Sequence, residues 1–250
     1  ELRLSVGPGA AKYASNPQPS IKKLLQSTDG GRTWLSEPMN LPVGGVRGWP
    51  VIMTQLSSGR LLCAIDERLR AEWDRSCQKV IGHLNGYAIW STNFHHVLRN
   101  RLFIVYSDDN GKTWNGFDKP IDSSPLIWCE LNKPFIERSD GTITVPIWGC
   151  LSAKDDNERR DAGGLLRSTD GGKTWGDFSL IAYDKDHPWT VGYNEAVIAP
   201  VKEDLWVAFM RTEFRGVGNE SGWTSRAIST DGGYTWSPPE LCTLGAAFGA

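Results

Sequence analysis

The sequence predicts an all-β fold built from repeated antiparallel units, and two periodic features support this prediction. The first is a phrase of the pattern S-x-D-x-G-x-T-W, which begins at positions 27, 107, 168 and 229. The second is a pair of apolar, β-branched runs joined by a short polar turn, which occurs around Gly59, Gly141 and Asp204 and predicts a β-hairpin. Recurrence of fixed motifs along a chain is the signature of a repeat architecture.

The two features combine into one four-stranded unit. Each hairpin is followed by a third strand that leads into the phrase, such as "LFIVYS" before Asp108, and by a fourth strand that leaves it. The phrase is the turn between them, because Asp and Gly supply the backbone conformations of a tight reversal. Its Trp is expected to pack into the adjoining core. Repeated four-stranded units predict a β-propeller.

The repeat also sets the expected domain organisation. We expect a single propeller domain over residues 1–250, with blades at approximately residues 1–45 (partial), 46–125, 126–186 and 187–250. Because propellers have roughly four to eight blades, we expect these residues to form an incomplete propeller, as part of a longer chain or of an assembly. The sequence predicts no oligomeric state.

Composition narrows the function classes. There are 27 Lys+Arg against 29 Asp+Glu, and without a basic block neither nucleic acid nor an anionic membrane is indicated as a partner. No apolar run is long enough for a membrane span, and the five cysteines form no C-x-x-C pair that would indicate a zinc site. No cofactor motif is present. A glycosylation sequon at Asn219 is compatible with secretion, so a secreted or periplasmic location is slightly favoured.

The predicted strand directions place a functional site opposite the phrases. The hairpin turns and the phrases should lie on one face of the ring, and the remaining loops on the other. From hairpin turn to phrase the chain uses 48 positions in the first complete unit (59 to 107), against 27 (141 to 168) and 25 (204 to 229) in the next two. The extra length is thus expected to project on the opposite face, where five charged residues also fall: Arg47, Arg68, Asp74, Glu195 and Arg211.

The phrases resemble the Asp boxes, or BNR repeats, of the sialidase superfamily, and the charged residues extend the resemblance. "Arg47-Gly48-Trp49-Pro50" is similar to that family's Arg-Ile-Pro motif with one residue added. Arg68 and Asp74 match an Arg and an Asp that follow the first hairpin, and Glu195 and Arg211 match a later Glu-hairpin-Arg unit.

The resemblance implies an exo-glycosidase that releases terminal sialic acid from sialylated glycans with retention of configuration and without a metal. Arg47 and Arg211 would bind the substrate carboxylate. Asp74 would be the general acid and base, and Glu195 would take the proton of a nucleophilic Tyr. Arg68, Tyr193 and Trp49 are further candidates for contacts to the substrate.

Several alternatives stay open at this point. The family's nucleophilic Tyr and third Arg are not found in the sequence, and three acidic residues compete with Asp74: Asp66, Glu67 and Glu72. Because a fold does not fix a function, the alternatives are a hydrolase or lyase for another acidic sugar, or a non-catalytic propeller that binds carbohydrate or protein. His95 and His96 are interpreted as solvated loop histidines, and the charge run at residues 153–161 as a solvated loop.

Overall fold

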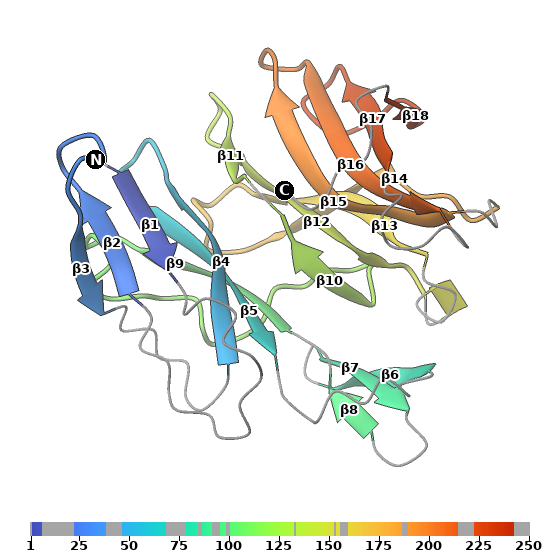
Figure 1. Cartoon of the computed structure of the whole chain (residues 1–250), viewed down its shortest axis with the longest axis horizontal. Helices are drawn as coiled ribbons and strands as arrows, with labels where there is room; N and C mark the ends of the chain where they lie inside the picture. Colours follow the sequence, from blue (N-terminus) through green and yellow to red (C-terminus); the bar gives the residue numbers. More distant parts are fainter. Residues whose placement is uncertain are drawn as a thin grey trace.

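A computed structural model of the chain confirms the all-β fold class. The structure describes residues 2–6, 23–38, 47–68, 79–84, 87–91, 96–98, 101–132, 134–152, 154–155, 160–186, 190–214 and 223–242. Figure 1 shows four antiparallel sheets that follow one another in chain order, with a fifth sheet set apart from them.

Each of the four sheets is a meander in which strands close in sequence pair with each other. The first sheet contains β1 (Leu2–Val6), β2 (Lys23–Ser27) and β3 (Leu35–Pro38). The second contains β4 (Arg47–Gln55), β5 (Leu61–Arg68) and β9 (Arg101–Ser107). The third contains β10 (Trp128–Leu131), β12 (Ile143–Cys150), β13 (Ala162–Ser168) and β14 (Gly176–Ala182), with β11 (Ile136–Glu137) beside β12. The fourth contains β15 (Thr190–Pro200), β16 (Trp206–Phe214), β17 (Trp223–Ser229) and β18 (Glu240–Leu241).

The second sheet differs from the predicted four-stranded unit. Its described strands number three, and an isolated bridge between Tyr106 and Asn115 replaces the fourth. The Ile121 N–H donates to the Leu102 carbonyl at 2.8 Å, farther along the same strand edge. Pro120 lies between these two contacts in the sequence and has no N–H to donate, which interrupts a regular ladder.

The insertion between β5 and β9 also differs from the expected loop. It forms a small antiparallel sheet of β6 (Lys79–Leu84), β7 (Tyr87–Ser91) and β8 (His96–Leu98). Short runs such as "YAIWS" contain the aromatic and β-branched residues that favour strands. His96 therefore begins a strand rather than lying in a loop, which corrects the prediction for this residue. His95 lies outside the described residues.

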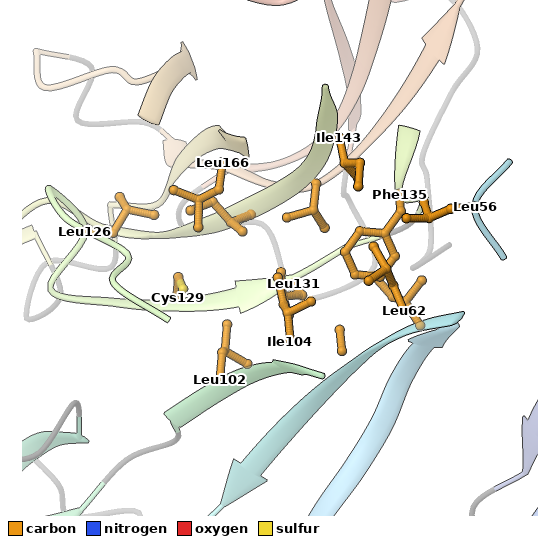
Figure 2. Close-up of a cluster of buried hydrophobic side chains, with 14 of the residues drawn as sticks. Leu56, Leu62, Leu102, Ile104, Leu126, Cys129, Leu131, Phe135, Ile143 and Leu166 are labelled. Atoms are coloured by element: carbon orange, nitrogen blue, oxygen red, sulfur yellow. The ribbon is translucent and has the colours of Figure 1, made fainter. Parts of the chain in front are cut away.

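The third sheet is buried on both of its faces. Leu166 belongs to a core cluster shared with the second sheet, which Figure 2 shows as Leu62 and Ile104 facing Leu131 and Leu166. Its neighbour Leu165 faces the other way, into a cluster with Trp206 and further residues of the fourth sheet, because successive strand residues point to opposite faces. Burial of each such leucine contributes about 1.5–3 kcal/mol. All seven residues of β13 are accordingly buried.

The four Asp boxes are structural turns, as predicted, and share one hydrogen-bond network. In the second box the Ser107 hydroxyl donates to Asp109 at 2.8 Å and accepts from the Gly111 N–H at 2.8 Å. The Thr113 hydroxyl and N–H donate to the same carboxylate at 2.6 and 2.9 Å. The Thr113 hydroxyl, the Thr113 N–H and the Ser107 hydroxyl together lower the pKa of Asp109 to about 2. Equivalent bonds surround Asp29, Asp170 and Asp231.

The box tryptophans pack as expected in three of the four copies. Trp114 is buried, and Trp175 and Trp236 pack against the cores on either side of the third sheet. Trp34, in the first box, is 36% exposed, which differs from the expected packing. In each box the indole N–H donates to the carbonyl of the second glycine position, at 3.0–3.1 Å. The indole therefore closes the turn even where it does not enter a core.

The hairpin turns and the boxes lie on one face, as predicted, and we call this the box face. Arg60, beside the β4–β5 turn, donates to Asp108 at 2.6 Å and to the carbonyl of Gly171, in the box of the third sheet, at 2.9 Å. Ser57 donates to Glu137 at 2.8 Å, so the turns of neighbouring sheets are also joined. The other ends of the hairpins define the opposite face.

Candidate functional site

An acidic and a basic side chain meet within the β15–β16 hairpin, in the half of the hairpin that is farther from its turn. The Arg211 Nη1 atom lies 3.4 Å from each carboxylate oxygen of Glu195. The two side chains are 26% and 29% exposed, so both reach solvent from a partly buried position. A distance of 3.4 Å is long for a hydrogen bond. The pair is thus longer than the charge-assisted hydrogen bonds that usually join an arginine to a carboxylate.

A β-bulge directs Glu195 toward Arg211. Asn194 pairs with Arg211 and Val197 pairs with Phe209, so two residues of β15 face one residue of β16 between these pairs. Bulges of this kind change the direction of a side chain and are common beside functional sites. Glu195 adopts φ of 47°, a left-handed conformation that is uncommon for a residue with a side chain. The backbone is therefore held in an unfavourable conformation at the predicted site residue.

Tyr193 lies in the core rather than on the surface. It is 9% exposed and belongs to the cluster between the third and fourth sheets. Burial, followed by the negative charge of Asp184, raises the pKa of the Tyr193 phenol. The structure thus shows a packing role for this ring, whereas its predicted contact with substrate stays a prediction.

A carboxylate that was not among the predicted site residues holds the strand before Glu195. The Asn194 side-chain amide donates to the Asp161 carboxylate at 2.9 Å, and the Tyr193 N–H donates to the Asp161 carbonyl at 3.0 Å. Gly192 lies so close that a Cβ added there would be 2.1 Å from the Asp161 carbonyl oxygen. A glycine is therefore required at this contact between the third and fourth sheets.

The interpretation of residues 153–161 as a solvated loop is wrong for Asp155 and Asp161, whose side chains form hydrogen bonds within the protein. Asp155 is buried and accepts hydrogen bonds from Ser152 and Tyr183, each at 2.6 Å. Asp161 is half-buried and binds Asn194 of the next sheet. A charge-rich sequence gave no indication of Tyr183 and Asn194 as partners, because they are 28 and 33 positions away from the aspartates that they bind.

The predicted residues of the second sheet are described only by their backbone or not at all. Arg47 and Arg68 are direct partners across β4 and β5, at the end away from the hairpin turn. Trp49 pairs with Asp66, and a bulge beside Pro50 takes up one residue of β4. The extra residue of the bulge is Val51, which follows the Arg47–Pro50 motif, so the bulge does not account for the residue by which this motif exceeds Arg-Ile-Pro. Asp74 lies outside the described residues, as do the side chains of Arg47, Trp49 and Arg68.

The described residues contain neither a cluster suited to a metal ion nor a helix suited to a membrane. In this part of the chain, His, Cys, Asp and Glu nowhere gather in a group of three or more that is suited to a metal ion. No helix among the described residues has the length and apolar character required to cross a membrane.

The antiparallel sheets, the four Asp boxes and the Glu–Arg pair opposite them define the class as an Asp-box β-propeller. A family model described as a BNR repeat-like domain matches residues 79–246. The chain belongs to this BNR repeat-like family.

The similar proteins of known sequence are sialidases. The chain is 29% identical over 231 residues to a sialidase of Bacteroides fragilis (strain YCH46), which covers 87% of this chain and 37% of that protein. It is 30% identical over 149 residues to a sialidase of Clostridium perfringens, covering 53% of this chain and 33% of that protein. The chain thus spans about a third of the length of these relatives.

Solved structures show the same fold at lower identity. A protein of unknown function from Dyadobacter fermentans matches with a TM-score of 0.66 at 23% identity, over 93% of this chain and 61% of that one. The NanB sialidase of Streptococcus pneumoniae matches with a TM-score of 0.58 at 12% identity, over 90% of this chain and 47% of that one. The fold is that of sialidase β-propellers.

Proposed function

We propose that this protein is an exo-glycosidase that hydrolyses terminal sialic acid from glycans with retention of configuration. The observation that carries the proposal is the Glu195–Arg211 pair, which combines a 3.4 Å contact with a left-handed Glu195 in a β-bulge on the opposite face. Backbone strain of this kind is concentrated at functional sites. The similarity to sialidases supports this choice of substrate class.

Each residue has a chemical role in this proposal. The guanidinium groups of Arg211 and Arg47 bind the substrate carboxylate through charge-assisted hydrogen bonds. Asp74 protonates the glycosidic oxygen as the aglycone leaves and then deprotonates the attacking water. Glu195 takes the proton of the nucleophilic phenol, which stays without an assigned residue. Arg68 and Trp49 contribute contacts around the sugar.

The same arginine chemistry suits two alternatives. A hydrolase or lyase for another acidic sugar would also bind a carboxylate through Arg211, and so would a propeller that binds an acidic glycan without cleaving it. Catalysis distinguishes the two enzyme functions from the binding function, because only an enzyme depends on proton transfer by Glu195. The identity of the sugar released distinguishes the enzymes from each other.

The test is hydrolysis of a fluorogenic aryl sialoside by the wild-type chain and by Glu195→Gln. We expect the substitution to lower kcat by about 10²–10⁴-fold, the usual contribution of a general acid–base group, while the affinity for free sialic acid changes little. Unchanged turnover would remove Glu195 from the mechanism. Binding of sialic acid by a wild-type chain that releases no aglycone would favour the binding propeller.

A matched control is available in the same sheet. Glu240 forms a 3.3 Å pair with Arg226, and these side chains are 70% and 50% exposed on the neighbouring strands β18 and β17. Glu240→Gln thus removes the same charge from a similar pair away from the proposed site. We expect it to keep wild-type kcat.

A further inference from the structure

One close backbone contact and two unfavourable features occur within four consecutive residues just before and at Glu195. Gly192 has φ of 87° and contacts the Asp161 backbone too closely for a side chain. Asn194 is 6% exposed, and among the described residues its buried Oδ1 atom has no hydrogen-bond partner. Glu195 itself has φ of 47°. Strained or unsatisfied groups of this kind persist only where the surrounding structure determines them.

Asp161 supplies the contacts that hold this segment. Its carboxylate accepts from the Asn194 amide at 2.9 Å, and its carbonyl accepts from the Tyr193 N–H at 3.0 Å. The Cys150 thiol lies 3.7 Å from the other carboxylate oxygen, which keeps this side chain directed toward β15. Hydrogen bonds to a charged acceptor are stronger than those between neutral groups. The contact from Asp161 to Asn194 can therefore offset the cost of the buried Asn194 oxygen.

Glu195 is fixed from both sides as a result. Before it, Tyr193 and Asn194 are bound to Asp161 of the third sheet. After it, Ala196 and Ile198 are 0% and 2% exposed in the core cluster. With its neighbours held on both sides, the left-handed backbone at Glu195 cannot relax without breaking a contact between sheets.

We propose that Asp161 is a positioning residue for Glu195: through Asn194 and Tyr193 it holds the bulge that directs the Glu195 carboxylate to Arg211. The link to turnover rests on the proposed function. The positioning itself does not, because it is a property of the protein without substrate. Asp161 acts only through the strand that it holds, so it has no contact with the reacting atoms in this proposal.

The test compares Asp161→Ala with Asp155→Ala, which removes another hydrogen-bonded carboxylate from the same loop without touching β15. Hydrogen exchange of the amides at residues 192–196 is measured first, without substrate. We expect these amides to exchange at least about tenfold faster in Asp161→Ala than in the wild type, and not in Asp155→Ala. The reason is that local opening of this segment in Asp161→Ala no longer has to break a charge-assisted hydrogen bond. Equal exchange in the two variants would overturn the proposal. If Asp161→Ala does not fold, Asn194→Ala removes the same hydrogen bond from the other side, with the same expectation.

Turnover of an aryl sialoside is the second readout. We expect Asp161→Ala to lower kcat by about 10- to 100-fold with little change in KM, because misplacement of a reacting group affects the chemical step. Asp161→Asn keeps an oxygen that can accept from Asn194, and we expect it to restore most of kcat. A kcat equal to that of Asp155→Ala would overturn the link to turnover. A wild-type chain without hydrolysis would refute the proposed function, whereas the exchange measurement would still decide the positioning role.

Discussion

Replacing Gly192 with alanine should weaken the contact between the third and fourth sheets beside Asp161. Gly192 has φ of 87°, and an added Cβ would lie 2.1 Å from the Asp161 carbonyl oxygen and 2.5 Å from its nitrogen. Both atoms belong to the backbone, so the overlap cannot be removed by rotation of a side chain. Either the segment before Glu195 or the start of β13 must move.

The magnitude follows from two separate costs. A left-handed backbone costs a residue with a Cβ about 1–2 kcal/mol, and overpacking against a fixed neighbour typically adds about 1–3 kcal/mol. The expected loss for Gly192→Ala is therefore about 2–5 kcal/mol of unfolding free energy. Gly141 is the matched control, because its φ is 83° and nothing lies within 4 Å of an added Cβ. Gly141→Ala should lose only about 1–2 kcal/mol.

Urea unfolding, followed by tryptophan fluorescence, measures both variants under the same conditions. The difference between them isolates the overlap with Asp161 and should be about 1–3 kcal/mol. For a chain of this size that difference corresponds to roughly 2–12 °C in Tm. Equal losses in the two variants would refute the close approach of Gly192 to Asp161, and with it the geometry that positions Glu195.

Two further predictions concern the turns and the core. The hydrogen bonds of the box outweigh partial burial and lower the pKa of Asp170 from 3.8 to about 2, so the stability that it contributes is present above about pH 4 and is lost as the pH falls toward 2. Asp170→Asn should therefore reduce the loss of stability between pH 4 and pH 2 in urea unfolding, and an unchanged acid dependence would contradict a paired carboxylate. Trp206 is 1% exposed, whereas Trp223 of the same sheet is 44% exposed. Trp206→Ala should lower the free energy of unfolding by about 3–5 kcal/mol, and Trp223→Ala should lower it by less than about 1 kcal/mol. Similar losses in the two variants would contradict the burial of Trp206 in the core between the third and fourth sheets.

The features that the sequence predicts correctly depend on residues close together in the chain. A box needs only Ser107, Asp109 and Thr113, whose hydrogen bonds span two to four positions. Hairpin turns around Gly59 and Gly141 are equally local. Because the strands alternate in direction, the hairpin turns and the boxes must lie on one face and the other loops on the opposite face. The general location of a site in those loops therefore follows without knowledge of the packing.

The features that the sequence does not predict depend on contacts between distant segments. Asn194 binds Asp161, which is 33 positions away in another sheet, and a charge-rich loop sequence alone favours solvation instead. The bulge at Glu195 cannot be predicted from the sequence pattern either. Regular alternation along β15 would place Tyr193 and Ala196 on opposite faces, whereas both lie in one core cluster. The strand pairing around Glu195 thus follows from the tertiary core.

A retaining sialidase site on the opposite face can be tested by a time course of aryl α-sialoside hydrolysis followed by proton NMR. Retention proceeds through two displacements at the anomeric carbon. We therefore expect the α-anomer of free sialic acid to form first, before it equilibrates in water. Initial formation of the β-anomer would contradict retention, and the absence of any released sialic acid would contradict the proposed hydrolytic activity of this chain.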